Sequence, residues 1–254
     1  MSRFRNTIGG AVTIAALSLP LAASAEGASV VLVHGAFSNS AAWDKVIPIL
    51  QDAGVSVSAA HLGLSALKAD ADTVTRLLDL QDGPVVLVGH SYGGSVITEA
   101  GAHPKVDHLV YIAGFALEAG QSLADLTEGQ PPAPWQAELY PDADGYLRLT
   151  ETGIAQFFAP DLAPADTAVM AATQGPLNYA TTQHAPSVAA WSVKPTSYVI
   201  AQHDQIISPK VQGYFAQKMG AEVTSVATSH VAMLADPDAV ASVILAAVQD
   251  LSSD

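Results

Sequence analysis

The hydrophobic positions of this chain form two alternating patterns. Short apolar runs rich in β-branched residues are typical of buried strands, whereas apolar residues spaced three and four apart are typical of one helix face. We expect six strands, at residues 28–33, 55–60, 84–89, 108–113, 196–201 and 222–226. Helical spacing lies between them, for example at 43–54 and 67–80. Because strands and helices alternate, the sequence predicts an α/β fold with a mostly parallel sheet and helices on both faces.

Helix-capping residues support the last two predicted helices. Ser208 is suited to an N-cap, Pro209 to the first helical position and Gly220 to the position after the helix. Asp236 and Pro237 open the final helix in the same way. Both helices therefore have defined starts.

The alternation stops at residues 117–195, which hold many prolines and aromatic residues. A structureless loop of this length is improbable inside a compact domain, so we expect a mostly helical insertion that forms a lid. Its aromatic residues suggest either an apolar pocket or packing within the lid itself; they are Trp135, Tyr140, Phe157, Phe158, Tyr179 and Trp191.

The first 25 residues have the three parts of a secretory signal peptide. Arg3 and Arg5 precede an apolar run over 8–22, and Ala23-Ser24-Ala25 resembles a cleavage site. An uncleaved membrane anchor is the alternative. We therefore expect removal of residues 1–25 and export to the periplasm or the medium, which leaves 26–254 as a single domain.

Composition narrows the classes of partner. The 254 residues include 24 acidic and 10 basic side chains, for a net charge of −14. This acidity disfavours nucleic acid and anionic membranes. The absence of cysteine excludes disulfides and thiolate metal sites. Neither a histidine pair with metal-ligand spacing nor a phosphate-binding loop is present, so no cofactor or metal is expected; the oligomeric state stays open.

The third predicted strand leads into Gly89-His90-Ser91-Tyr92-Gly93, followed by a helical segment. In this context Gly-x-Ser-x-Gly forms a nucleophile elbow, a strained turn that exposes the serine above the sheet. Cβ atoms at the two glycine positions would clash across such a turn. The alternative is a glycine-rich loop without chemistry.

A nucleophilic serine needs a base and an acid that orients the base, in the chain order serine, acid, histidine. Asp204 directly follows the fifth strand and His230 the sixth, so both belong at the carboxyl edge of the sheet with Ser91. Glu118 is the next candidate for the acid. His203 is the next candidate for the base.

The oxyanion hole needs two backbone N–H donors. Tyr92, after the nucleophile, supplies one, and Ala36, in the loop after the first strand, is expected to supply the other, with Phe37 close behind. His34 and His90 are expected to be structural hydrogen-bonding residues. The remaining histidines fit surface or loop positions: His61, His103, His108 and His184.

These motifs resemble the α/β-hydrolases, most closely the branch of plant methylesterases, hydroxynitrile lyases and bacterial esterases of similar length. The resemblance rests on residues 31–36, 89–94 and 229–234 and on Asp204, and it extends over nearly all of 28–250. It implies a Ser91–Asp204–His230 triad, donors at Ala36 and Tyr92, and a helical lid. Hydroxynitrile lyases of this branch carry lysine after the histidine, where this chain has Val231.

The leading hypothesis is a serine carboxylesterase that cleaves small apolar or aromatic esters through an acyl-enzyme on Ser91. Phe37, Phe115 and Trp191 are weaker candidates for substrate contacts. Lactonase, thioesterase, amidase and cofactor-free oxygenase chemistry are alternatives on the same fold. A ligand-binding protein that retains the triad is an alternative from another class.

Overall fold

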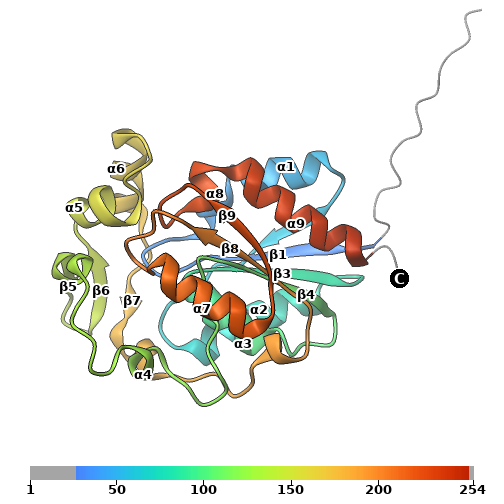
Figure 1. Cartoon of the computed structure of the whole chain (residues 1–254), viewed down its shortest axis with the longest axis horizontal. Coiled ribbons are helices and arrows are strands. Elements are labelled where there is room, and N and C mark those ends of the chain that lie inside the picture. Colours follow the sequence, from blue (N-terminus) through green and yellow to red (C-terminus); the bar gives the residue numbers. More distant parts are fainter. Residues whose placement is uncertain (1–26, 252–254) are drawn as a thin grey trace, which may run out of the picture.

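A computed structural model describes residues 27–251 and contains a six-stranded parallel sheet (Figure 1). Each strand pairs in parallel with its neighbours. The spatial order is β2 (Ser56–Ala59), β1 (Ser29–Val33), β3 (Val85–His90), β4 (Val106–Ile112), β8 (Thr196–Ala201) and β9 (Glu222–Val226). The predicted signal peptide lies outside the described residues.

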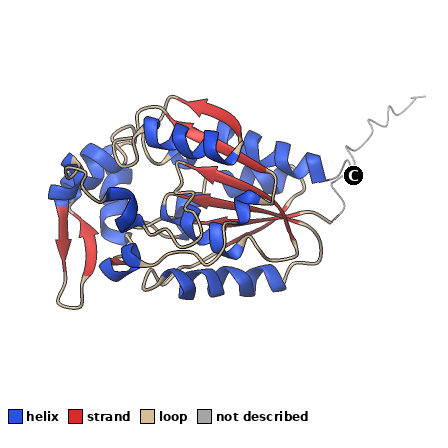
Figure 2. Ribbon diagram, turned by 60° about the horizontal axis from the view of Figure 1, so that its bottom comes forward, coloured by secondary structure: helices blue, strands red, loops and turns tan. Residues whose placement is uncertain are grey.

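Helices cover both faces of this sheet (Figures 1 and 2). On one face α1 (Val46–Asp52) packs against α9 (Pro237–Leu251), with the short α8 (Ala232–Ala235) beside them. On the other face lie α2 (Leu67–Asp79) and α3 (Tyr92–Ala100), which also contact each other. The helix α7 (Pro209–Met219) packs against β8. The predicted α/β fold is therefore confirmed.

Strand and helix boundaries agree closely with the sequence patterns, with one informative difference. The predicted helix over 43–54 is divided into a 3₁₀ turn, η1 (Ser40–Trp43), and α1. This division places Pro48 in the first turn of α1, where a backbone N–H has no partner within the helix. Proline is therefore tolerated at that position.

Most of the insertion between β4 and β8, green and yellow in Figure 1, lies at one end of the molecule, beyond the sheet. Its helical elements are α4 (Leu123–Thr127), η2 (Pro134–Glu138), α5 (Glu151–Gly153), a π-helical turn η3 (Ile154–Phe158), α6 (Pro164–Thr173), η4 (Tyr179–Gln183) and η5 (Ala190–Ser192). It also carries a small antiparallel sheet of β5 (Leu139–Pro141), β6 (Tyr146–Leu149) and β7 (Leu177–Asn178).

The prediction of a mostly helical insertion is incomplete because of these three strands. The β5–β6 hairpin depends on its turn, in which the Asp142 carboxylate accepts the N–H groups of Asp144 and Tyr146. Gly145 supplies the positive φ of 82° that this turn needs. Strands of two to four residues are too short for the alternation of apolar and polar residues to predict them.

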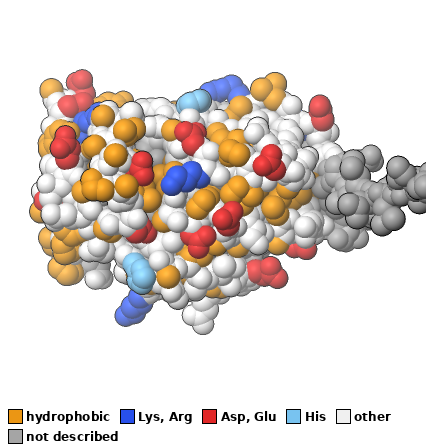
Figure 3. All heavy atoms as spheres, turned by 90° about the horizontal axis from the view of Figure 1, so that it is seen from above, with side chains coloured by type: hydrophobic (Ala, Val, Ile, Leu, Met, Phe, Trp, Pro, Cys, Tyr) orange, Lys and Arg blue, Asp and Glu red, His pale blue; other side chains and the backbone are white. Residues whose placement is uncertain are grey.

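Three further observations concern burial, surface charge and helix length. His108, expected on the surface, is buried in β4 and hydrogen-bonds the Ser197 hydroxyl at 3.0 Å, so that prediction is wrong. Acidic side chains are spread over the face seen in Figure 3, in keeping with the net charge. Within residues 27–251, no helix is both long and apolar enough to span a bilayer.

Candidate active site

The turn between β3 and α3 holds Ser91 in a strained backbone conformation. Its φ of 53° and ψ of −121° are rarely adopted by a residue with a side chain. The backbone is held on both sides: Ser91 N–H donates to Ile112 O, and Ser91 O accepts the N–H groups of Gly94 and Phe115. The surrounding hydrogen bonds therefore maintain the strain.

The tightness of this turn explains its flanking glycines. A Cβ atom at Gly89 would lie 2.6 Å from the Gly93 carbonyl oxygen. A Cβ atom at Gly93 would lie 2.5 Å from the Val33 carbonyl oxygen in β1. Backbone atoms cannot move aside at such distances, so both positions exclude a side chain. The geometry is that of the predicted elbow.

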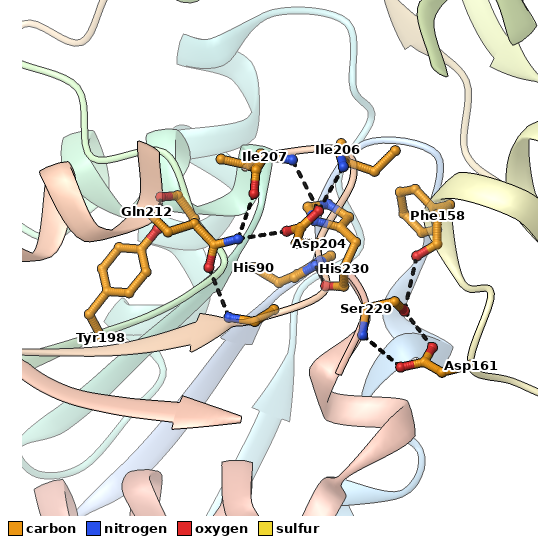
Figure 4. Close-up of polar contacts among 12 residues, drawn as sticks. His90, Phe158, Asp161, Tyr198, Asp204, Ile206, Ile207, Gln212, Ser229 and His230 are labelled. Carbon is orange, nitrogen blue, oxygen red and sulfur yellow. Dashed lines mark hydrogen bonds and ion pairs between the residues drawn. The ribbon is translucent and has the colours of Figure 1, made fainter. Parts of the chain in front are cut away.

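Asp204 and His230 follow β8 and β9, and the structure brings them together. His230 Nδ1 and Asp204 Oδ2 are 2.7 Å apart, and both side chains are fully buried (Figure 4). A donating Nδ1–H leaves Nε2 without a proton in the neutral ring. Nε2 is buried and makes no hydrogen bond within the described residues. The ring can therefore accept a proton at that nitrogen.

The Asp204 carboxylate also accepts three other hydrogen bonds. The backbone N–H groups of Ile206 and Ile207 donate to Oδ1 at 2.7 and 3.0 Å. The Gln212 side chain in α7 donates to Oδ2 at 2.8 Å. Sequence reasoning missed Gln212, because a glutamine eight residues after an aspartate carries no recognised signal.

His90 fixes the backbone of His230 rather than its ring. The His90 Nε2–H donates to the His230 carbonyl oxygen at 2.9 Å, and the two ring centroids are 4.6 Å apart. Burial, and secondarily the nearby His230, lower the pKa of His90 well below its ordinary value. His90 thus acts as a neutral hydrogen-bond donor, as expected for a structural histidine.

His34 also has a structural arrangement, at the end of β1. Its Nδ1 lies 2.9 Å from the Gly35 carbonyl oxygen, and its Nε2 accepts the Leu62 N–H at 3.1 Å. These partners require a neutral ring that carries its proton on Nδ1. Burial lowers the pKa of His34 to about 4, which agrees with that state.

The two expected oxyanion donors both border the cavity above Ser91. Tyr92 is the first residue of α3, so its N–H has no partner within the helix. The Ala36 N–H makes no hydrogen bond within the described residues, whereas the Phe37 N–H donates to Gly175 O at 3.1 Å. Of the two candidates in the first loop, Ala36 therefore has the available donor.

A cavity of about 230 Å³ lies above Ser91, beneath the insertion. Its lining contains no charged side chain and is mostly apolar. Phe37 and Phe115 line it as expected, and so do the insertion residues Trp135, Phe158 and Tyr179. Trp191 does not line it: its indole N–H donates to Leu117 O at 2.8 Å. Tyr140 and Phe157 are likewise absent from the lining.

The insertion contacts the His230 loop directly, a feature that sequence reasoning also missed. Phe158 packs edge-on against the His230 ring, with centroids 5.0 Å apart. The Asp161 carboxylate accepts both the N–H and the hydroxyl of Ser229 (Figure 4). Neither contact has a sequence signal, because both depend on how the insertion folds back over the sheet.

The alternative acid and base lie elsewhere. Glu118 is exposed and forms an ion pair with Lys218. His203 is exposed, and its backbone N–H donates to Thr228 O at 2.9 Å. Neither side chain hydrogen-bonds Asp204, His230 or Ser91. The geometry therefore favours Asp204 as the acid and His230 as the base.

Comparison with known proteins shows the family. A model of the alpha/beta hydrolase family matches residues 30–243. The chain therefore belongs to the α/β hydrolase family, as its motifs implied.

Several relatives are named as esterases or hydrolases. The carbendazim hydrolyzing esterase of Nocardioides sp. (strain SG-4G) is 35% identical over 120 residues, 41% of this chain and 50% of that protein. Methylesterase 1 of Arabidopsis thaliana is 28% identical over 152 residues, 52% of this chain and 56% of that protein. The chain thus aligns with about half the length of these curated relatives.

Solved structures extend the likeness to nearly the whole described fold. Polyneuridine aldehyde esterase superposes with a TM-score of 0.76 at 20% identity, covering 87% of this chain and 99% of that one. A pyrethroid hydrolase from Sphingobium faniae JZ-2 gives a TM-score of 0.75 at 22% identity, covering 87% and 98%. At these identities the likeness concerns the fold.

Proposed function

We propose that this protein is a serine carboxylesterase with Ser91 as nucleophile, His230 as general base and Asp204 as the acid that orients the base. The observation that carries the proposal is the 2.7 Å Asp204–His230 hydrogen bond, which leaves Nε2 without a partner in the described structure on a ring that packs against His90 of the elbow. The names of the relatives agree with ester cleavage.

In the proposed reaction, His230 Nε2 takes the hydroxyl proton as Ser91 attacks the ester carbonyl. The carbonyl oxygen becomes an oxyanion, which the N–H groups of Ala36 and Tyr92 stabilise. The imidazolium then returns its proton to the departing alcohol, and an acyl-enzyme remains. Water activated by His230 releases the acid. Asp204 stays ionised throughout and stabilises the imidazolium.

The cavity supports a particular class of substrate. An uncharged, mostly apolar wall binds an alkyl or aryl group well and gives no counter-ion to a charged one. Besides Ser91, its aliphatic polar side chains are Thr127, Gln136 and Thr182, and the aromatic residues Tyr92, Tyr179 and Trp135 carry a hydroxyl or an indole N–H. We therefore expect small apolar or aromatic carboxylic esters, rather than highly charged ones, as substrates.

Hydrolysis of a short and a medium-chain p-nitrophenyl ester by the purified protein tests this function. Ser91→Ala should abolish turnover. Ser95→Ala is the matched control, because its buried hydroxyl has no hydrogen-bond partner in the described structure and lies one helical turn along α3. Equal rates in wild type and Ser91→Ala would overturn the proposal. A melting shift with such an ester but no turnover would instead favour a ligand-binding protein.

We also propose export, on the evidence of the charged, apolar and small-residue segments in residues 1–25. Expression of the full chain in a bacterial host and N-terminal sequencing of the protein from each fraction tests it. A mature protein that starts at Glu26 outside the cytoplasm is expected. An intact N-terminus in the membrane fraction would favour the anchor instead.

A further inference from the structure

We infer that Gln212 is a positioning residue. It fixes the Asp204 carboxylate and weakens the electrostatic attraction between this carboxylate and a protonated His230. Gln212 is on the first turn of α7, which starts at Pro209, directly after the Ser208 N-cap. Its side chain is fully buried and points toward the loop that carries Asp204 (Figure 4). The inference rests on the proposed roles of Asp204 and His230.

Both N–H groups and the oxygen of this amide are hydrogen-bonded. Oε1 accepts the Ala201 N–H at 2.9 Å, at the end of β8. Nε2 donates to Ile207 O at 2.6 Å and to Asp204 Oδ2 at 2.8 Å. Because one partner can only donate and the other two only accept, the amide has a single possible orientation. Gln212 thus joins the strand, the loop and the carboxylate.

The contact with Asp204 has a specific chemical consequence. Gln212 Nε2 and His230 Nδ1 both donate to the same oxygen, Oδ2, at 2.8 and 2.7 Å. A neutral donor on that oxygen withdraws part of the negative charge that would otherwise act on the imidazolium. Gln212 holds Oδ2, and the Ile206 and Ile207 N–H groups hold Oδ1. Because both oxygens are held, the carboxylate cannot rotate.

Gln212→Met tests this role, since methionine has a similar length and cannot hydrogen-bond the carboxylate. We expect kcat to fall roughly 10- to 100-fold, the factor that results if the free energy of a hydrogen bond to a charged group is lost from the transition state. KM should change less than about twofold, because Gln212 does not line the cavity above Ser91. The acid limb of the kcat/KM profile should move to higher pH by roughly half a unit or more, since His230 then faces a more basic oxygen.

The other titratable groups around Asp204 and His230 are the same residues in the wild type and in Gln212→Met. His90 of β3 faces the His230 ring, Tyr198 of β8 lies near Asp204, and Asp161 of the insertion contacts Ser229. Burial lowers the pKa of His90 and raises the pKa of Tyr198, so both stay neutral through the assay range. A shift can then be assigned to the lost amide.

The chain offers a matched control in Gln174. This buried glutamine also makes three hydrogen bonds, but only to backbone groups of Leu149 and Ala171 in the insertion. Gln174→Met should therefore lose similar stability while its kcat per folded molecule and its pH profile stay close to those of the wild type. Gln212→Glu is a second variant, which keeps an acceptor for the Ala201 N–H if Gln212→Met fails to fold. Its introduced carboxylate should repel Asp204 and lower kcat more as pH rises.

A readout without turnover separates this inference from the proposed function. The His230 ring can be titrated by NMR in the resting protein, with its signal assigned by His230→Asn. Gln212→Met should raise the titration midpoint, and Gln174→Met should leave it in place. If the wild type is inactive, the proposed function fails and this titration still decides the inference. An unchanged midpoint in Gln212→Met, or kcat within twofold of wild type, would overturn it.

Discussion

The carboxylate of Asp161, in the insertion, accepts the backbone N–H of Ser229 with 2.6 Å between Oδ2 and N. Its other oxygen accepts the Ser229 hydroxyl. Ser229 directly precedes His230, so this pair ties the insertion to the loop of the proposed base. The position of the proposed base thus depends on a segment that is not part of the central sheet.

Loss of the Asp161–Ser229 hydrogen bonds should lower kcat more than it weakens substrate binding. Asp161→Ala leaves the Ser229 N–H without its partner, and we expect kcat to fall about 10-fold with little change in KM. Asp161→Asn retains an acceptor oxygen and should recover most of the activity. Asp144→Asn, an exposed acid in the β5–β6 turn, is the control. Steady-state kinetics would contradict the prediction if Asp161→Ala matched the wild type.

Gly35 should tolerate no side chain. A Cβ atom there would lie 2.7 Å from Ser91 Cβ and 3.1 Å from the His90 carbonyl oxygen. Gly35→Ala must therefore push the loop with the Ala36 donor away from Ser91, which should lower kcat/KM by about 100-fold. At Gly213 in α7 a Cβ atom would meet nothing within 4 Å. Gly213→Ala should therefore retain activity, and its free energy of unfolding should rise by about 0.5–1 kcal/mol. Similar rates for the two variants would contradict this account.

The Tyr92 side chain has a structural contact, in addition to the proposed role of its N–H as an oxyanion donor. Its hydroxyl donates to the buried Asp70 carboxylate at 2.8 Å, and burial raises the pKa of Asp70 above its usual range despite this bond. Tyr92→Phe leaves that oxygen unsatisfied and should lower the free energy of unfolding by about 1–3 kcal/mol. Urea denaturation measures it, with the exposed Tyr140→Phe as control. Asp70→Asn in the Tyr92→Phe protein should restore part of the loss.

His34 should make the fold sensitive to acid. Its pKa is lowered from 6.5 to about 4, so between these values the unfolded chain takes up a proton and the folded chain does not. The contribution of His34 to the free energy of unfolding is constant above pH 6.5. As pH decreases toward 4, this contribution lowers the free energy of unfolding by roughly 3 kcal/mol in all. His34→Gln keeps a donor and an acceptor without titrating, so it should reduce the slope of unfolding free energy against pH. The exposed His184→Gln should not reduce it.

The residues predicted best are those whose position follows from one strand. The β8 and β9 ranges agree with the predicted strands, because segments with several β-branched residues there are bounded by clear turns. Ser91, Asp204 and His230 each follow a strand, and parallel strands bring their carboxyl ends to one edge. Their catalytic roles stay a prediction until mutants are assayed.

The residues that were missed depend on packing between distant segments. Gln212 reaches Asp204 because α7 docks against β8, and no local pattern encodes that contact. Phe158 was expected only as one of several lid aromatics, and its edge-on contact with His230 needs the path of the insertion. Trp191 was expected at the substrate and instead lies beside Lys218, 5.4 Å from the ring centroid.

The hydrogen bond from His90 to the His230 carbonyl oxygen joins residues 140 positions apart. The turn that holds Ser91 is thus synthesised long before the histidine loop that completes the site. A nascent chain that ends after β4 contains Ser91 but neither Asp204 nor His230. In the proposed esterase reaction, which needs all three residues, we therefore expect hydrolysis only from molecules whose synthesis has passed His230 and whose folding has brought the three residues together.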